Sequence, residues 1–312
     1  MELTRKILEG DVRAAARLMT MIENGVLEAR AALKSLYAHT GSGYIIGITG
    51  PPGSGKSTLT DQLTDELRKR RKTVGIVAVD PTSPFTGGAI LADRIRMQHH
   101  SLDADVFIRS MATRGHMGGL ARATNDIVDV MDAAGKEVIL IETVGVGQDE
   151  VEVVGTAHTC VVVSVPGLGD EVQVIKAGIL EIGDVFVVNK ADREGADRTA
   201  TELEMMLHMA PDTGGWLPKV YKTVATKGEG IAGLVDAIFE HKAFLDERDL
   251  RKKKGRERSE RAFLALLQET LTARTIERFK RNGSMKELIE RIADRELDPY
   301  TAVEEVLESI GL

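Results

Sequence analysis

The feature that most constrains the fold is a regular alternation of apolar runs and helical stretches between residues 44 and about 242. Apolar runs of strand length recur there, and segments with helical spacing separate them. This alternation is typical of an α/β fold, a mostly parallel sheet with helices on both faces, because each parallel strand needs a long crossover. The strands are predicted at 44–49, 73–80, 105–109, 137–142, 159–165, 184–189 and 219–224.

A polar residue, a glycine or a proline stands where most of these runs end. The residues at the ends are Gly50, Asp80, Arg109, Glu142, Pro166, Asn189 and, after the last run, Ala225. The carboxyl ends of parallel strands meet at one edge of the sheet, and ligands of open α/β sheets bind there. We therefore expect these residues to converge on one crevice.

Two flanking segments fall outside the alternation. Residues 1–40 predict an N-terminal helical extension of two helices, broken near Asn24-Gly25, and residues 41–244 form the α/β core. Residues 245–312 predict an all-helical arm. Its apolar residues recur at helical intervals, at Leu264, Leu267, Leu271, Leu288, Ile289, Ile292, Val303, Val306 and Ile310.

Composition excludes several classes of protein. The net charge of −7 gives no basic footprint for nucleic acid, and 43% hydrophobic residues can build a large core. No apolar run approaches the roughly 18 residues that would span a bilayer. The first residues lack the apolar segment of a secretory signal, so the cytoplasm is the expected compartment. Cys160 is the only cysteine, which excludes an internal disulfide, and its apolar surroundings predict a buried strand residue.

A glycine-rich segment directly after the first predicted strand fits the phosphate-binding loop pattern G-x-x-x-x-G-K-[ST]. The segment is Gly50-Pro51-Pro52-Gly53-Ser54-Gly55-Lys56-Ser57, followed by Thr58 in a predicted helix. Glycines let backbone amides point at phosphate oxygens beside the positive end of that helix. Lys56 would reach the β- and γ-phosphates, and the Ser57 hydroxyl would bind Mg²⁺. The sequence therefore predicts a nucleoside triphosphate site.

A second motif, N-K-x-D, predicts which base is bound. Asn189-Lys190-Ala191-Asp192 follows the strand at 184–189. A carboxylate can accept hydrogen bonds from the ring N–H and the amine of guanine, whereas adenine offers neither there. Lys190 would lie against the base or support the phosphate loop. After the next strand, Ala225-Thr226-Lys227 stands where a backbone amide can meet the guanine oxygen.

Acidic residues that could bind Mg²⁺ end two of the predicted strands. Glu142, in Glu142-Thr143-Val144-Gly145, occupies the place of the D-x-x-G element of GTPases, with glutamate instead of aspartate. It could bind the ion directly or through water. Asp80 and Asp93 offer further carboxylate oxygens.

With these residues identified, the chain closely resembles the MeaB/ArgK family of P-loop GTPases over essentially its whole length. These proteins are chaperones of methylmalonyl-CoA mutase and related cobalamin-dependent acyl-CoA mutases. Besides the loop at 50–58 and N-K-x-D, the resemblance rests on residues 79–84, 87–94, Arg109-Ser110, 113–115, 142–148, 166–173 and 176–178.

The resemblance implies a slow GTPase whose GTP or GDP state gates adenosylcobalamin delivery to a mutase and protects that mutase. It also implies that Asp80, Asp93 and Glu142 join Ser57 around Mg²⁺. Residues 167–176, with Asp170, Gln173 and Lys176, would be a switch that signals to the partner. Such proteins are typically homodimers joined through the C-terminal arm, with neither nucleic acid nor membrane as partner.

The catalytic machinery departs from that of Ras-like GTPases. Val146 follows Gly145 where those proteins place glutamine, and Gln148 comes two residues later. Gln148 is therefore a candidate for orienting water, and Lys176 or Arg114 could supply positive charge beside the catalytic Lys56 and Glu142. Phosphoryl transfer depends on positioning and charge neutralisation, so slow intrinsic turnover is expected.

Two other functions remain open. A metallochaperone GTPase of the HypB or UreG kind would need a metal-binding cluster, and His99 and His100 are expected to diverge by roughly 100° on a helix. An ATPase or kinase of amino-acid transport would bind ATP as well as GTP. Comparison of the two nucleotides separates it from a GTPase.

Overall fold

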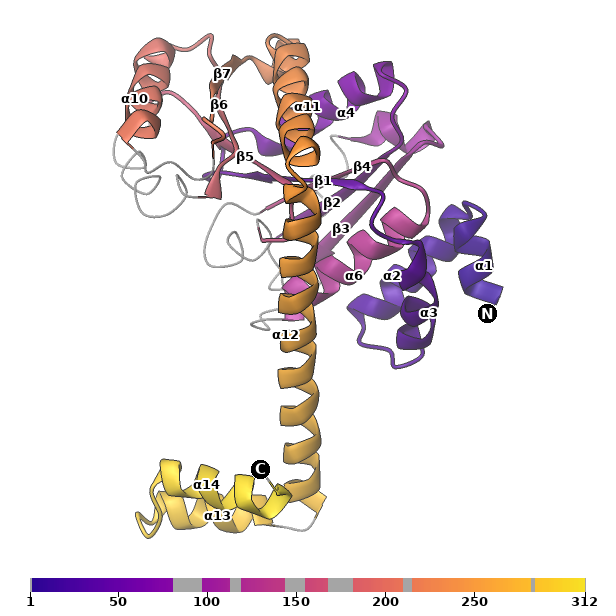
Figure 1. Ribbon diagram of the computed structural model, residues 1–312, viewed down its shortest axis with the longest axis vertical. Coiled ribbons are helices and arrows are strands. Elements are labelled where there is room, and N and C mark those ends of the chain that lie inside the picture. Colours follow the sequence, from indigo (N-terminus) through magenta and orange to yellow (C-terminus); the bar gives the residue numbers. More distant parts are fainter. Residues whose placement is uncertain are drawn as a thin grey trace. The chain divides into compact units, whose positions relative to one another are not determined.

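The computed structural model describes residues 2–80, 97–112, 119–143, 155–167, 182–209, 215–281 and 284–311. The chain divides into two compact units, Met1–Arg258 and Ser259–Leu312. The first holds the sheet and the N-terminal helices, so these helices pack with the core (Figure 1). The boundaries predicted from composition, at residues 40 and 244, stay predictions.

The sheet of the first unit is parallel throughout, with the strand order β3-β2-β4-β1-β5-β6-β7 (Figure 1). Its strands are β1 (Tyr44–Thr49), β2 (Val74–Asp80), β3 (Val106–Ala112), β4 (Val138–Glu142), β5 (Thr159–Ser164), β6 (Val185–Asn189) and β7 (Val220–Thr223). Each predicted strand is present, and the α/β fold class is confirmed. Cys160 lies buried in β5, as predicted.

Helices flank the sheet and build the N- and C-terminal segments. They are α1 (Glu2–Leu8), α2 (Val12–Glu23), α3 (Ala29–Leu36), α4 (Lys56–Lys69), α6 (Gly119–Ala133), α10 (Ala196–Met209), α11 (Ile231–Glu247), α12 (Leu250–Arg281), α13 (Ser284–Ala293) and α14 (Pro299–Ile310). Short 3₁₀ turns are η1 (Tyr37–His39), η2 (Gln98–Leu102) and η4 (Ala225–Lys227). Among the described residues, none of these helices combines the length and apolar character that a bilayer crossing requires.

Alternating side chains of the strands supply two apolar layers, because successive residues of a strand point to opposite faces. In β1, Ile45 packs in the layer that contains α6 and the N-terminal helices. Ile46 and Ile48 pack in the opposite layer, which contains α4 and α11. Further along the sheet, α10 covers Phe186 and Val188 on the α6 side. Every strand of the centre is therefore buried on both faces, as a parallel sheet requires.

The N-terminal extension contains three helices, so the prediction of two is wrong. The break near Asn24-Gly25 is present, but a second break precedes it at Gly10, which has a positive φ of 86°. Asp11 then caps α2, its carboxylate accepting from the backbone N–H of Arg13 at 2.8 Å and of Ala14 at 3.0 Å. An aspartate at an N-cap satisfies amides that the first turn leaves unpaired.

Arg109 lies inside a strand, so its predicted place at a strand end is wrong. β3 continues to Ala112, and Arg109 pairs with Glu23 of α2, its Nε donating to Glu23 Oε1 at 3.1 Å. Both side chains are about 85% buried, with exposed fractions of 14% and 15%. This ion pair connects α2 to β3, the edge strand of the sheet. Arg109 therefore contributes to packing and is not one of the residues at the predicted crevice.

We expect acid to destabilise the fold through His241, which lies buried in α11 with its Nδ1 2.8 Å from Thr159 Oγ1. Burial lowers the pKa of His241 from 6.5 to about 4; Asp184 opposes this shift and Lys254 adds to it. Between these two pH values His241 is therefore protonated in the unfolded chain and neutral in the folded chain. The stabilisation is complete above pH 6.5 and is lost as the pH falls toward 4.

The measurement is denaturant unfolding at about pH 7.5 and at about pH 5.5. Protonation of His241 alone should make the free energy of unfolding about 1 kcal/mol lower at pH 5.5 than at pH 7.5. His158 adds in the same direction, because burial lowers its pKa to about 3. His241→Gln should reduce the pH dependence, and His208→Gln, at an exposed site, should leave it unchanged. An equal pH dependence in both variants would contradict this assignment.

Candidate functional site

The predicted site residues gather at the carboxyl edge of five neighbouring strands, β4-β1-β5-β6-β7. Residues 50–57 leave β1, which lies between β4 and β5. Glu142 ends β4 on one side, and Asn189 ends β6 beyond β5 on the other. Because neighbouring strands lie about 4.8 Å apart, the ends of β1 and β6 stand roughly 10 Å apart across the sheet, and the loop after β1 reaches across to Asn189. One crevice can therefore hold phosphates at β1 and a base near β6 and β7.

Two glycines let the loop after β1 pass close to the neighbouring strands. Gly50 has a φ of 141°, and a Cβ there would lie 2.0 Å from the carbonyl oxygen of Val163 in β5. Gly55 has a φ of 89°, and its Cβ would lie 2.5 Å from Asn189 Nδ2. Any side chain at either position would clash and would strain the backbone. Both glycines are thus required by contacts outside the loop as well as by its own turns.

The loop presents positive charge and a helix N-terminus to the same space. α4 begins at Lys56, so the amides of its first turn have no partner within the helix. The Lys56 ammonium is buried and donates to the carbonyl oxygens of Gly50 at 2.7 Å and Pro51 at 3.1 Å. Ser54 Oγ is also buried and has no hydrogen-bond partner among the described residues. Such a loop is suited to bind an anionic phosphate.

The rest of the loop lies nearer the solvent. Pro52 and Gly53 are exposed, whereas Pro51, Ser57 and Thr58 are half-buried.

Two oxygen ligands for a divalent cation meet beside the loop. Ser57 Oγ donates to Glu142 Oε1 at 2.5 Å, and Glu142 is buried at the end of β4. A hydroxyl and a carboxylate are hard oxygen donors of the kind that Mg²⁺ prefers, so this pair fits that ion. Asp80 ends β2, the other neighbour of β4, two residues beyond the pair Ala78 and Glu142. The backbone of Asp80 thus ends at the same edge.

Asn189 joins the two halves of the crevice. Its Nδ2 donates to the carbonyl oxygen of Ser54 at 2.9 Å, and its Oδ1 accepts from Thr223 Oγ1 at 3.1 Å and from the Ala225 amide at 3.2 Å. The side chain is buried, so each of these bonds is shielded from water. The first residue of N-K-x-D therefore fixes the phosphate loop to the segment after β7.

Lys190 supports the phosphate loop, which was one of the two roles predicted for it. Its Nζ donates to the carbonyl oxygen of Gly53 at 2.7 Å, and its backbone has a φ of 55°. This left-handed conformation turns the chain sharply after β6. The loop is therefore held from two consecutive residues of the N-K-x-D motif.

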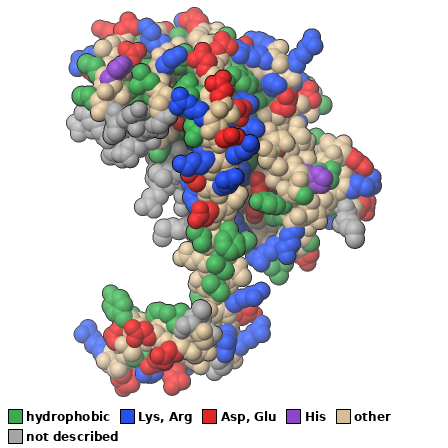
Figure 2. All heavy atoms as spheres, viewed as in Figure 1, with side chains coloured by type: hydrophobic (Ala, Val, Ile, Leu, Met, Phe, Trp, Pro, Cys, Tyr) green, Lys and Arg blue, Asp and Glu red, His purple; other side chains and the backbone are tan. Residues whose placement is uncertain are grey.

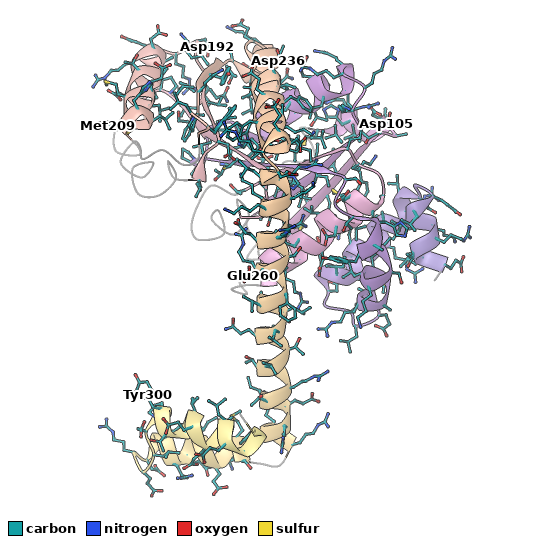
Figure 3. All side chains as sticks on the ribbon, viewed as in Figure 1. Asp105, Asp192, Met209, Asp236, Glu260 and Tyr300 are labelled. Atoms are coloured by element: carbon teal, nitrogen blue, oxygen red, sulfur yellow. The ribbon has the colours of Figure 1, made fainter. Side chains whose placement is uncertain are left out.

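Asp192, labelled in Figure 3, lies close to the turn after β7. Its carboxylate is half-exposed, and its Oδ2 lies 3.5 Å from Lys227 Nζ. Ala225 is buried in η4, and Thr226 and Lys227 are exposed there. A carboxylate, a backbone turn and an ammonium thus lie together at the end of β6 and β7.

Several predicted site residues lie outside the described residues. They are the metal ligand Asp93 and the catalytic or switch residues Arg114, Gly145, Gln148, Asp170, Gln173 and Lys176. Their roles stay predictions.

Thr223 ends β7 and is one of the hydrogen-bond partners of Asn189, although the sequence did not predict it as a site residue. Its hydroxyl donates to Asn189 Oδ1, and its carbonyl accepts from the Ala191 amide at 3.0 Å. A threonine two residues before the predicted Ala225 turn was the available signal, since a hydroxyl at a strand end can reach the neighbouring strand.

The expectation that His99 and His100 diverge is wrong. Both lie in η2, and their ring centroids are 4.0 Å apart. Successive residues of a 3₁₀ segment also diverge along the backbone, so the side chains themselves bring the rings together, because both imidazoles reach toward Asp61 and Asp65 of α4. Together with Asp61 and Asp65 of α4 they form a compact group outside the crevice.

Comparison with known proteins identifies relatives of this chain. A family model described as Methylmalonyl Co-A mutase-associated GTPase MeaB matches residues 15–280. A Pyrococcus abyssi protein that carries the name of a GTPase is 52% identical over 312 residues, covering 99% of this chain and 96% of that protein.

A Mus musculus protein named methylmalonic aciduria type A homolog, mitochondrial, is 38% identical over 202 residues, which cover 63% of this chain and 49% of that protein. The solved structure of a LAO/AO transport system kinase has a TM-score of 0.74 at 24% identity and covers 100% of this chain and 97% of its own. At that identity the match shows the fold.

Asn189→Ala should weaken the crevice as a unit, because it removes all three hydrogen bonds that Asn189 makes. We expect the free energy of unfolding to fall by about 1–3 kcal/mol and nucleotide affinity to fall at least about tenfold. Denaturant unfolding and fluorescent-nucleotide titration measure the two effects. Asn125→Ala, which removes one half-buried bond from Thr156, is the control and should leave nucleotide affinity intact. Equal nucleotide affinities of the two variants would refute the linking role.

Proposed function

The chain belongs to the methylmalonyl Co-A mutase-associated GTPase family, MeaB, and we propose that it is a Mg²⁺-dependent GTP switch acting on a cobalamin-dependent acyl-CoA mutase. It is a P-loop GTPase, as the members of this family are. The nucleotide state would gate the loading of adenosylcobalamin into the mutase and protect the mutase from inactivation.

The observation that carries this proposal is the hydrogen bond from Asn189 to Ser54. It joins the motif for the guanine base to the loop for the phosphates, so one rigid unit would hold both ends of GTP. Asp192 would accept from the ring N–H and the amine of guanine, and its ion pair with Lys227 would hold that carboxylate in place. The Ala225 amide, or the turn through Thr226, would face the guanine oxygen.

The phosphate side would hold the ion and the transferred phosphoryl group. Ser57 and Glu142 would bind Mg²⁺, joined by Asp80 and Asp93. When bound, the ion supplies charge neutralisation at the phosphate oxygens. Lys56 would leave the carbonyl oxygens of the loop and donate to the β- and γ-phosphates, where it stabilises the charge that develops during transfer.

Hydrolysis would be slow without a partner. Gln148 is the proposed water-orienting residue, and Lys176 or Arg114 the proposed source of added positive charge. The segment with Asp170 and Gln173 would report the nucleotide state to the mutase, and Gly145 would adjust to the presence of the γ-phosphate. A site whose positioning groups are completed by a partner turns over faster once that partner binds.

The names of the family and of the mouse relative support the choice of partner. The family is described as associated with methylmalonyl Co-A mutase, and the mouse protein is named for methylmalonic aciduria. This chain aligns with that relative over 63% of its length. A mutase that uses cobalamin is therefore the partner to test.

We also propose that the chain is a homodimer joined through its C-terminal arm. In the Ser259–Leu312 unit, the small core around Phe279, Leu288 and Ala302 leaves several apolar side chains uncovered (Figure 2). The exposed side chains are Phe263, Leu264, Leu266, Leu267, Leu271, Ile276, Ile289, Tyr300, Val303 and Leu307. A second copy could cover this surface, and light scattering of the full chain measures its mass in solution.

Asp192→Asn tests the choice of base. The variant loses two charge-assisted hydrogen bonds to guanine, so the affinity for GTP should fall at least about 100-fold. The affinity for XTP should rise, because xanthine carries a carbonyl that an amide can donate to. Asp197→Asn, at an exposed carboxylate of α10, is the matched control. Unchanged GTP affinity in Asp192→Asn, or equal ATP and GTP affinity in the wild type, would contradict guanine recognition.

Turnover with and without a mutase tests the partner. A cobalamin-dependent methylmalonyl-CoA mutase should raise GTP turnover at least about tenfold, whereas an acyl-CoA enzyme without cobalamin should not. Lys56→Ala should abolish turnover in both mixtures, which shows that the reaction belongs to this site. If mutase leaves the wild-type rate unchanged, the partner is wrong even where Asp192→Asn confirms GTP.

A further inference from the structure

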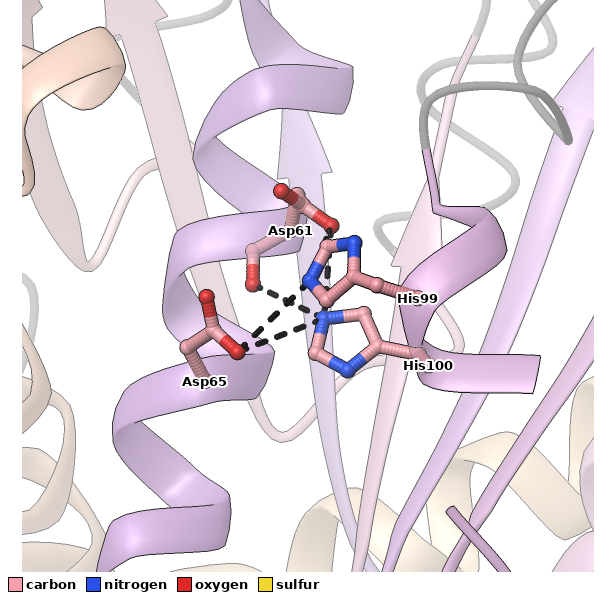
Figure 4. Close-up of side chains that lie close together, drawn as sticks. All are labelled: Asp61, Asp65, His99 and His100. Atoms are coloured by element: carbon pink, nitrogen blue, oxygen red, sulfur yellow. Dashed lines mark hydrogen bonds and ion pairs between the residues drawn. The ribbon is translucent and has the colours of Figure 1, made fainter. Parts of the chain in front are cut away.

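A group of histidine and aspartate side chains lies outside the nucleotide crevice, and we name it the His–Asp cluster. It consists of Asp61 and Asp65 on α4 and His99 and His100 on η2 (Figure 4). Asp61 and Asp65 are four residues apart, so they share one face of the helix. Both imidazoles point from η2 toward these two carboxylates (Figure 4). Two segments that are distant in sequence thus bring four metal-binding side chains to one place.

The nitrogen–oxygen distances within the His–Asp cluster are close to those in the ligand shell of a tetrahedral ion, and all four ligand atoms lie within 4.8 Å of one another. Nε2 of His100 lies 3.3 Å from Asp61 Oδ1 and 3.7 Å from Asp65 Oδ1. Nε2 of His99 lies 3.6 Å and 3.7 Å from the same two oxygens. Metal–ligand bonds of about 2.0–2.1 Å place tetrahedral ligands about 3.3–3.4 Å apart. Each of the four nitrogen–oxygen distances is close to that value.

Hydrogen bonding inside the cluster does not satisfy its most buried oxygen. Asp61 Oδ1 is enclosed, and although His100 Nε2 lies 3.3 Å away, no residue that the structure describes donates a well-directed hydrogen bond to it. His100 is itself 4% exposed, so little water reaches it. A buried carboxylate oxygen without a donor is costly, whereas an ion between the four ligand atoms would satisfy it.

The charges of the cluster also suit a divalent cation. Two carboxylates and two neutral imidazoles balance a charge of +2. Both carboxylates lie within 3.7 Å of the Nε2 atom of each imidazole, so negative charge is concentrated beside two nitrogen ligands.

We propose that Asp61, Asp65, His99 and His100 bind one divalent transition-metal ion, with Zn²⁺ as the probe. Imidazole nitrogen favours Zn²⁺, Co²⁺ or Ni²⁺ over Mg²⁺, which prefers oxygen and octahedral coordination. The site is therefore separate from the Mg²⁺ ligands Ser57 and Glu142, both in residues and in chemistry. It does not depend on the identity of the nucleotide or of the partner protein.

The ion would join α4 to η2. α4 carries Lys56 and Ser57 in its first turn, and Asp61 lies about 6 Å further along the same helix at 1.5 Å per residue. η2 leads into β3 and follows residues 81–96, the part of the sequence that carries Asp93. The metal would thus act as a structural link beside the phosphate loop, with all four protein ligands in place.

The experiment titrates the full chain, without a purification tag, after treatment with a chelator and its removal. Zn²⁺ is added in competition with a chromophoric chelator, with Mg²⁺ in large excess and no nucleotide present. We expect one equivalent of Zn²⁺ per chain, and Co²⁺ in its place should give the intense visible absorption of tetrahedral coordination. Zn²⁺ should also raise the melting temperature.

His99→Ala and Asp65→Asn are the test variants, because both side chains are partly exposed, at 52% and 39%, and their replacement should leave the fold intact. Each should lower Zn²⁺ affinity at least about tenfold and abolish the rise in melting temperature. His208→Ala and Asp197→Asn, which change exposed residues of α10, are the matched controls. Their affinity should equal that of the wild type.

Two results would overturn the proposal. One is binding of much less than one equivalent of Zn²⁺ to the wild type. The other is a Zn²⁺ affinity in His99→Ala and Asp65→Asn that equals that of the controls, which would place the ion elsewhere. Circular dichroism of each variant separates a lost ligand from a lost fold.

Discussion

The parallel hydrogen-bonded ladders on both sides of β1 are the constraint on which the rest of the structure depends. β1 pairs with β4 and with β5, so the loop that leaves it emerges between the ends of two neighbours. From that position the loop meets Glu142 on one side and the carbonyl of Val163 on the other. A glycine at position 50 is the consequence, because the β5 backbone stands where a side chain would be. The glycine at the start of the phosphate-binding loop is thus required by the packing of the sheet as well as by the binding of a ligand.

The fold could be predicted from the sequence in most of its parts because its signals are local. Each strand is a short apolar run between turn residues, and the parallel arrangement follows from the crossovers between the runs. Arg109 is a residue whose position and contacts could not be predicted from local sequence signals. Its strand continues for three residues beyond the predicted end, and its partner Glu23 comes from a helix 86 residues earlier in the chain. No pattern along the sequence indicates such an ion pair.

The candidate site was predictable in its membership and only partly in its contacts. The spacing of the glycines, Lys56 and Ser57 identifies the phosphate loop, since the pattern is contiguous. The bond from Asn189 to Ser54 spans 135 residues, and it depends on the order of the strands. The arrangement of His99 and His100 depends on their contacts with Asp61 and Asp65, which come from a helix more than 30 residues earlier in the chain. Tertiary geometry decides both.

The carbonyl contacts of Lys56 have a consequence for the energetics of ligand entry. The ammonium is buried and donates to the carbonyl oxygens of Gly50 and Pro51. An arriving anion therefore meets a largely dehydrated cation and displaces these carbonyl dipoles. The free-energy cost of removing water from the lysine is included in the free energy of folding. It therefore does not reduce the free energy of ligand binding. The carbonyls act as a temporary ligand set that keeps the lysine ready for exchange.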